Sequence, residues 1–420
     1  MTASETVFTR NNMDAMRAAV RETVERTPLT DIHTHLYAPA FGKLLLWGVD
    51  ELLTYHYLIA EVVRASRIEP AAFYAKNKRE QADFIWQTLF LERSPYSEAC
   101  RGVLTVLDTL GLDVASRDLA AYRAYFAQQT VEGYIDTVFE RANLKSVVMT
   151  NDPFDDAERP VWESGIEADR RFHAALRIDL VLNNWASACA RLKGWGYGAD
   201  ETLSKKALAE TRRFLADWLR RTKALYMAVS LPQDFAFPEE SPRARLIAEC
   251  IIPVAREYNV PFAMMIGVKR AMNPALKLAG DGVGKSDVGA VERLCVSYPD
   301  AKFMVTMLAR EDQHELSIAA RKFPNLFLFG CWWFLNVPGI IEEMTRMRFE
   351  LLGTCVLPQH SDARVLDQVI YKWSHSRAII ANVLADKYAD LLRTGWALKQ
   401  SELDRDVAGL LGGNFWDYLK

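Results

Sequence analysis

Short apolar segments alternate with longer amphipathic segments along most of this chain. Most of the apolar segments lack the strict polar–apolar alternation of a half-exposed strand. Continuous apolar segments of this length are typical of strands that are buried on both faces of a parallel sheet. We predict eight such strands: Leu29–Leu36, Leu144–Thr150, His173–Asp179, Ala224–Leu231, Phe262–Val268, Phe303–Leu308, Leu326–Trp332 and Thr354–Pro358.

The segments between these strands place apolar residues at helical spacing, for example in KALAETRRFLADWLRRT and SPRARLIAECIIPVAREY. Eight strands that alternate with helices predict an α/β fold, specifically a (β/α)₈ barrel of the TIM type. A doubly wound open sheet is the alternative, but eight repeating units favour closure of the sheet.

The first two predicted strands are separated by a long stretch, residues 39–143, which has the pattern of several helices. A structureless loop of this length would be unusual inside a compact domain. We therefore expect one barrel domain over residues 1–420, with residues 39–143 forming a helical insertion over the barrel mouth. The mouth is the carboxyl end of the strands, where barrel enzymes carry their active sites.

The composition is that of an ordinary globular protein of 420 residues with 50% hydrophobic residues and a formal net charge of -3. It contains no block of Lys and Arg, which argues against nucleic acid or an anionic membrane as a partner. The first residues do not resemble a signal peptide, and the apolar segment 260–268 is far shorter than the ~20 residues of a membrane span. The six cysteines are scattered without a C-x-x-C pair, as in reduced cytosolic proteins. We expect a cytoplasmic protein.

Two histidines, His33 and His35, lie in DIHTHL at the end of the first predicted strand. Residues i and i+2 of a strand face the same side, so both imidazoles should point to one place at the mouth. Neutral imidazole binds Zn, Mn and Fe, which predicts one divalent metal ion, with zinc as the first choice. The alternative is a pair of polar residues that line the barrel interior.

A third ligand should come from a neighbouring strand end, and PQHSDAR follows the eighth predicted strand. Asp362 is the preferred candidate because a carboxylate completes a site of two histidines and one acid. His360 is the competitor, and a supporting structural role suits it better.

Arg177 ends the third predicted strand and Arg364 follows the eighth. Each offers a fork for a carboxylate or a cation for a neighbour, although an ion pair with a loop acid is the simpler interpretation. Trp332 and Trp333 are equally suited to line a sugar site or to pack in the barrel core. The adjacent pair His56 and Tyr57, on an apolar helix of the insertion, would by itself indicate only core packing.

The H-T-H motif at the first strand, with an acid at the eighth, resembles the amidohydrolase superfamily. Further segments make the chain resemble the uronate isomerases, in a shorter bacterial branch, from about residue 20 to the end. These segments are LLWGVDELLTYHYLIAEV, RSPYSEACRGVLT, VVMTNDPFDD, RFHAALRID, FGCWWF and PQHSDARVLDQVIYKW.

The resemblance implies a set of metal ligands, namely His33, His35 and Asp362. It also implies that Tyr57 is the catalytic base with Arg364 beside it, that His56 orients the substrate, and that Arg177 holds the substrate carboxylate. The substrate would be a small uronate: D-glucuronate converted to D-fructuronate, and D-galacturonate to D-tagaturonate. The fifth and sixth predicted strands have no histidine, which favours one metal ion and weakens a hydrolytic interpretation.

The expected chemistry is metal-assisted proton transfer between C2 and C1 of the sugar. Tyr57 would remove the C2 proton, helped by the charge of Arg364, and Asp362 or an adjacent water would return a proton to C1. A hydride shift is the mechanistic alternative. A metal-dependent hydrolase or decarboxylase and a non-enzymatic sugar-acid binder are the alternative functions, and we expect a homo-oligomer.

Overall fold

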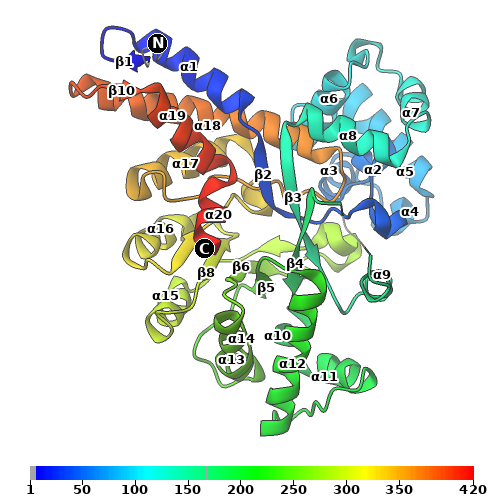
Figure 1. Cartoon of the computed structure of the whole chain (residues 1–420). Helices are drawn as coiled ribbons and strands as arrows, with labels where there is room; N and C mark the ends of the chain where they lie inside the picture. The colour runs from blue at the N-terminus through cyan, green and yellow to red at the C-terminus, as the bar shows by residue number, and fades with distance from the viewer. Residues whose placement is uncertain (1–5, 167–168) are drawn as a thin grey trace.

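The computed structural model of the chain describes residues 6–166 and 169–420. Its centre is a curled sheet of seven parallel strands in the order β2-β3-β4-β5-β6-β8-β9 (Figure 1). These strands are β2 (Leu29–Thr34), β3 (Leu144–Asn151), β4 (Phe172–Arg177), β5 (Met227–Pro232), β6 (Phe262–Lys269), β8 (Phe303–Met307) and β9 (Leu326–Leu328). The short strand β7 (Gly282–Val283) is antiparallel to β6. A parallel sheet with helices in its connections is an α/β fold, as the pattern predicts.

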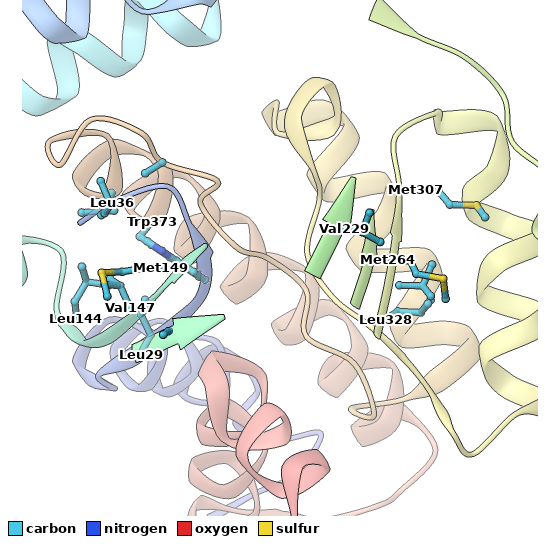
Figure 2. Close-up of a cluster of buried hydrophobic side chains, with 14 of the residues drawn as sticks. Leu29, Leu36, Leu144, Val147, Met149, Val229, Met264, Met307, Leu328 and Trp373 are labelled. Atoms are coloured by element: carbon cyan, nitrogen blue, oxygen red, sulfur yellow. The ribbon is translucent and has the colours of Figure 1, made fainter. Parts of the chain in front are cut away.

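Alternate residues of the strands face two different layers. In β3, Val147 and Met149 belong to the outer cluster beneath the helices, whereas Val148 belongs to the inner cluster inside the curled sheet. Figure 2 shows outer-layer side chains, including Met149 of β3 near Trp373, a residue of the long helix α18 (Gln368–Arg393). Both faces are therefore buried, which explains why the strand sequences are continuously apolar.

Helices follow the strands and cover the outer face of the sheet. They are α9 (Arg159–Glu163), α10 (Asp179–Asn183), α11 (Trp185–Gly194), α12 (Lys205–Thr222), α13 (Pro242–Leu246), α14 (Ile252–Glu257), α15 (Val288–Ser297), α16 (Gln313–Lys322) and α17 (Pro338–Leu352). The first helix, α1 (Met13–Arg26), packs along α18. Strands β1 (Val7–Phe8) and β10 (Leu398–Lys399) form a separate antiparallel pair.

The stretch between β2 and β3 is helical, as the sequence predicts, and forms a group beside the sheet (Figure 1). Its helices are α2 (Val49–Leu53), α3 (His56–Ser66), α4 (Pro70–Tyr74), α5 (Lys78–Ile85), α6 (Glu98–Thr109), α7 (Leu119–Ala127) and α8 (Val131–Arg141). Helix α6 packs against α18. The insertion is thus anchored on the helix that follows the last ligand-bearing loop.

The C-terminal helices are α19 (Gln400–Ala408), which packs on α1, and α20 (Asn414–Leu419), which lies at the amino ends of the strands. Phe415 of α20 belongs to the inner hydrophobic cluster, and Trp416 Nε1 donates to Thr30 Oγ1 at 3.2 Å. Thr30 lies near the amino end of β2, so α20 closes the amino ends of the strands. The carboxyl ends are left as the place for a site.

Seven of the eight predicted strands are present, with ends that differ by up to four residues. The eighth prediction, a strand over Thr354–Pro358, is wrong: this segment has only an isolated parallel bridge between Leu357 and Phe329. Pro358 has no backbone N–H and cannot extend the ladder. The following residues bond to the other edge of the sheet instead, with Asp362 N–H donating to His33 O (3.1 Å) and His35 N–H donating to Ala363 O (2.7 Å).

The six cysteines form no disulfide; five are buried, and Cys355 is exposed. Burial raises the pKa of the Cys331 thiol to about 11, so it stays protonated and unreactive at neutral pH. Within residues 6–166 and 169–420, no helix has both the length and the apolar character needed to cross a membrane.

Candidate metal centre and active site

Three predicted ligands converge at the carboxyl end of β2. Asp362 Oδ1 lies 3.5 Å from His33 Nε2 and 3.3 Å from His35 Nε2. One ligand atom from each of the three residues lies within 4.8 Å of the other two. The ring centroids of His33 and His35 are 5.4 Å apart, so the i, i+2 spacing places both rings at one point, as predicted.

The far side of each ligand imidazole faces a hydroxyl group. Thr150 Oγ1 lies 2.8 Å from His35 Nδ1, and it also donates to Thr34 O at 3.0 Å. Tyr226 donates to Ile32 O at 2.6 Å, and its hydroxyl lies 3.5 Å from His33 Nδ1. With Nδ1 oriented in this way, Nε2 of each ring is directed toward Asp362. Such partners on the outer side of metal-binding histidines fix the ring orientation.

The electrostatics of the cluster favour the forms that bind a cation. Burial, and then the charge of Arg364, lowers the pKa of His35 to about 3, so its imidazole is neutral at pH 7. Burial alone would raise the pKa of Asp362, but the imidazoles of His33 and His35, whose Nε2 atoms lie 3.5 and 3.3 Å from its Oδ1, hold the pKa well below its usual value. Neutral imidazole and ionised carboxylate are the states that coordinate a metal.

Among the described residues, the buried atoms His33 Nε2 and Asp362 Oδ1 have no hydrogen-bond partner. Buried polar atoms without partners are costly and rare, so two of them facing one point are suited to bind a common ligand. The residues present therefore fit a divalent metal ion.

His360 does not join this group of ligand atoms. Its ring is buried, its centroid lies 5.0 Å from that of His33, and neither ring nitrogen has a partner among the described residues. Gly330, with φ of +66°, makes room for it, because a Cβ at that position would lie 1.9 Å from His360 Cδ2. His360 is a neighbour of the ligand set, in agreement with the preference for Asp362.

Three aromatic residues at the start of α3 form a second cluster, which consists of Tyr55, His56 and Tyr57. The centroid of His56 lies 4.1 Å from that of Tyr55 and 4.5 Å from that of Tyr57. The hydroxyls of both tyrosines and Nε2 of His56 are buried and lack hydrogen-bond partners within the described residues. Like the ligand cluster, this cluster presents polar atoms that a bound molecule can satisfy.

The protonation states of the aromatic cluster are set mainly by burial. Burial, and then the charge of Arg364, lowers the pKa of His56 to about 3. Burial raises the pKa of Tyr57 well above 10, with Tyr55 and Asp362 adding to the effect, and Arg364 offsets only part of it. Arg364 therefore acts on the pKa of Tyr57 in the expected direction, but the effect of burial is larger.

Arg177 lies at the end of β4, but its fork is already occupied. Its Nε and Nη2 each donate to the Asp179 carboxylate at 3.0 Å, and that carboxylate raises the pKa of the guanidinium further. The ion pair with an acid, the simpler of the two interpretations, is thus present, although the acid is the first residue of α10 and not a loop residue. Nη1 makes no hydrogen bond among the described residues and is the free end of the group.

The two tryptophans share a hydrophobic cluster but differ in their polar surroundings. Both Trp332 and Trp333 are buried in the inner cluster, as the core interpretation predicts. Trp333 has a left-handed backbone (φ of +48°), and its ring meets that of His56 edge-on at 5.7 Å. Its Nε1 is buried without a partner in the described part of the chain, so Trp333 belongs to the wall that the aromatic cluster forms.

The sequence did not single out Tyr55, although the repeated tyrosine in TYHYL was a visible signal. It also missed Asp31 and Lys372, which are buried behind the ligand loop. No local motif marks those two, because their partners lie far away along the chain.

An α/β fold with two histidines and one carboxylate at the carboxyl end of its parallel strands defines a candidate metal-dependent enzyme. No family model and no curated protein matches this chain. Among solved structures, a uronate isomerase of Bacillus halodurans C-125 is 56% identical with a TM-score of 0.96, over 97% of both chains. The chain belongs to the uronate isomerase family.

Two more distant structures share the fold. A uronate isomerase of Thermotoga maritima has a TM-score of 0.77 at 15% identity, over 96% of this chain and 97% of that one. A glucuronate isomerase of Caulobacter crescentus has a TM-score of 0.75 at 17% identity, over 97% of this chain and 94% of that one. At these identities the likeness concerns the arrangement of the chain alone.

Proposed function

We propose that this protein is a uronate isomerase that interconverts D-glucuronate with D-fructuronate and D-galacturonate with D-tagaturonate. The observation that carries the proposal is the pairing of the three-ligand cluster with a wall of unpartnered aromatic hydroxyl and imidazole groups. A hydrolase needs the first element, whereas an isomerase also needs an acid or base away from the ligands. Membership of the family supports the same assignment.

We also propose that the sheet closes as a (β/α)₈ barrel, with the segment 357–363 in the place of the eighth strand. Leu357 exchanges hydrogen bonds with the β9 side, through Leu328 O and Gly330 N–H. Asp362 and Ala363 bond to β2 on the other side. The whole chain would then be one barrel domain, and residues 39–143 would cover the mouth through Tyr55, His56 and Tyr57.

His33, His35 and Asp362 would hold the metal, and zinc is our first choice because its ligands in proteins are commonly of these types. A bound divalent ion would supply Lewis-acid polarisation of substrate oxygens. The protein's own residues would move the protons: Tyr57 would accept the proton from C2, and the carboxylate of Asp362 would take the proton of the C2 hydroxyl and deliver it to C1. His56 and Trp333 would direct polar atoms at the sugar hydroxyls.

The raised pKa of Tyr57 limits when this base can act. The free phenol is neutral at pH 7, because burial disfavours the phenolate. The phenol must therefore lose its proton to solvent as the substrate binds, before Tyr57 can accept the C2 proton, and Arg364 is the cation that would stabilise the phenolate. General bases work best when their pKa is close to the working pH. Substrate binding therefore has to lower the pKa of Tyr57 toward neutral pH.

Arg177 would hold the carboxylate at the far end of the uronate. Because Asp179 occupies Nε and Nη2, the substrate can either use the free Nη1 or displace Asp179. Either arrangement fixes the far end of the sugar and places C1 and C2 at the ligand cluster, which favours reaction through positioning.

The direct test is to incubate the purified, zinc-loaded protein with D-glucuronate and to follow ketose signals by NMR. We expect D-fructuronate to appear until the two sugars reach equilibrium, and chelator treatment to stop the reaction. Absence of a ketose from both D-glucuronate and D-galacturonate would contradict the proposal. A cytoplasmic location and a homo-oligomer remain predictions, and the second is checked by sedimentation.

A further inference from the structure

The backbone of the carboxylate ligand Asp362 has an uncommon conformation. Asp362 has φ of +53°, in the left-handed region that residues other than glycine rarely adopt. Such a conformation persists only where the surroundings hold it in place. The preceding residue, Ser361, is fully buried, and both of its backbone polar groups are bound by side chains.

Those two side chains come from different parts of the chain. Asp31 Oδ1 accepts from Ser361 N–H at 3.1 Å, and Lys372 Nζ donates to Ser361 O at 2.6 Å. Asp31 lies on β2, two residues before His33. Trp373, the neighbour of Lys372 on α18, donates through Nε1 to Asp31 Oδ2 at 2.8 Å. The strand that carries both histidines and the loop that carries Asp362 are thus joined through α18.

A buried lysine at position 372 is an unfavourable choice if its only role is to bind the Ser361 carbonyl. Its side chain is 2% exposed, and burial lowers its pKa although Asp362, Asp31 and Glu98 favour its charged form. A buried ammonium costs free energy unless charges compensate for it. A neutral donor is already present, because Asn336 Nδ2 donates to the same Ser361 carbonyl at 3.1 Å. A hydrogen bond to that carbonyl does not by itself explain a lysine.

A second contact of the same ammonium group points to the site. Lys372 Nζ lies 5.8 Å from the ring centroid of Tyr57, within the range of a cation–π contact. One side chain therefore contacts both the loop of the ligand Asp362 and the ring of the proposed base. The loop of Asp362 and the helix of Tyr57 are far apart in the sequence. Among the described residues, no other side chain is seen to contact both.

We propose that Lys372 is a positioning residue, which holds Asp362 toward His33 and His35 and sets the ring of Tyr57 against the same point. This inference rests on the proposed metal site and extends it to a residue outside the ligand set. It predicts that loss of the ammonium weakens metal binding more than it weakens the fold.

The test compares Lys372→Met with Arg377→Met. Arg377 lies on the same helix, is 3% exposed, and also donates to backbone carbonyls, those of Thr27 (3.0 Å) and Asn143 (3.2 Å). These carbonyls lie just before β2 and β3, at the end of the sheet away from the ligands. Zinc affinity is measured by competition with a chromophoric chelator, and Tm is measured on the same samples without zinc.

We expect Lys372→Met to lower zinc affinity by ~10–100-fold, the usual effect of losing a partner that orients a ligand. Arg377→Met should lower Tm and leave zinc affinity unchanged. Zinc affinity of Lys372→Met equal to that of the wild type would overturn the proposal. An equal loss in both variants would overturn it as well, because the effect would then be general destabilisation.

If Lys372→Met does not fold, Lys372→Gln retains an amide donor and replaces the charge, and a wild-type zinc affinity in it overturns the proposal. Kinetics with zinc at saturation add a second readout: kcat should fall while KM for D-glucuronate changes little. Zinc binding can be measured whether or not the wild type isomerises uronates. Failure of the proposed activity is thereby distinguished from failure of this inference.

Discussion

The ligand cluster on β2 and the aromatic cluster on α3 are close enough for Asp362 to affect the pKa of His56 and Tyr57, but the two clusters are built in different ways. His33 and His35 project from a strand whose hydrogen bonds continue on both sides, and Asp362 is bonded to the same strand through His33 O. Tyr55, His56 and Tyr57 project from the first turn of a helix in the insertion. The ligand cluster is thus part of the sheet, and the aromatic cluster is brought to it.

Burial has opposite chemical consequences in the two clusters. For His35 it lowers the pKa to about 3 and so produces the neutral ligand that a metal needs. For Tyr57 it raises the pKa and so opposes the phenolate that a base needs. In the proposed mechanism, the ligand cluster is therefore ready without substrate, whereas the aromatic cluster requires substrate to complete it. The following predictions test this difference.

The largest effect is expected from the ligands. His33→Asn or His35→Asn should abolish stable zinc binding and lower kcat/KM by more than ~100-fold. Loss of a residue that only supports a ligand lowers metal affinity or activity by ~10–100-fold, and loss of a direct ligand should cost more. Elemental analysis and isomerase assays measure both. His314→Asn, an exposed histidine on α16, is the control and should retain its zinc. Full zinc occupancy in both ligand variants would remove these residues from the site.

Tyr57, the proposed base on α3, should have the next largest effect. Tyr57→Phe removes one oxygen and should lower kcat by ~100-fold or more, the lower range for loss of a general base, with zinc content unchanged. Tyr122→Phe, a buried tyrosine of the insertion that donates to Asp113 O, is the matched control and should keep its kcat.

Substrate deuterated at C2 sharpens the same prediction. Exchange through a phenol should release part of the label to solvent during turnover. Complete transfer of the label to C1, with full activity in Tyr57→Phe, would favour a hydride shift and exclude this base.

Arg177 should affect substrate binding more than turnover. Arg177→Met should raise KM for D-glucuronate by ~10-fold or more, since a hydrogen bond to a charged group contributes ~1.5–3 kcal/mol. Arg171→Met is the control, because Arg171 makes a similar bidentate pair with Asp169 at the other end of β4. An unchanged KM in Arg177→Met would show that the substrate carboxylate is held elsewhere.

The smallest effect concerns how the insertion is anchored. Asp367, at the start of α18, accepts from Gly48 N–H at 2.8 Å and from the Tyr134 hydroxyl, both in the insertion. Burial raises its pKa to about 6, so the folded protein holds this proton more tightly than the unfolded chain does. The contribution of the protonated Asp367 carboxyl to the free energy of unfolding is therefore full below about pH 4, and it is lost as the pH rises through about 6.

Asp367→Asn cannot titrate and should flatten this part of the curve of Tm against pH, a difference of ~1–3 kcal/mol at most. Thermal unfolding of both proteins between pH 4 and pH 7 measures it. An identical slope in the wild type and in Asp367→Asn would mean that this carboxyl does not titrate in that range.

The pattern of the sequence determined the elements that depend on local spacing. Continuous apolar strands and amphipathic helices predicted the parallel α/β sheet, because the alternation of burial follows directly from the pleat of a strand. The i, i+2 spacing of His33 and His35 predicted one ligand site for the same reason. The length and periodicity of residues 39–143 predicted helices there.

Only the tertiary structure decided features that depend on distant partners. Pro358 and the bonds of Asp362 to β2 decided that the eighth segment is not a regular strand. The fork of Arg177 is occupied because the fold brings Asp179 to it, and Tyr57 is protonated because the fold buries its hydroxyl. The role of Lys372 depends on Ser361 and Tyr57, which the fold brings to it from separate segments. Hydrogen bonding and desolvation are set by which groups meet in space, and residue spacing along a chain does not determine that.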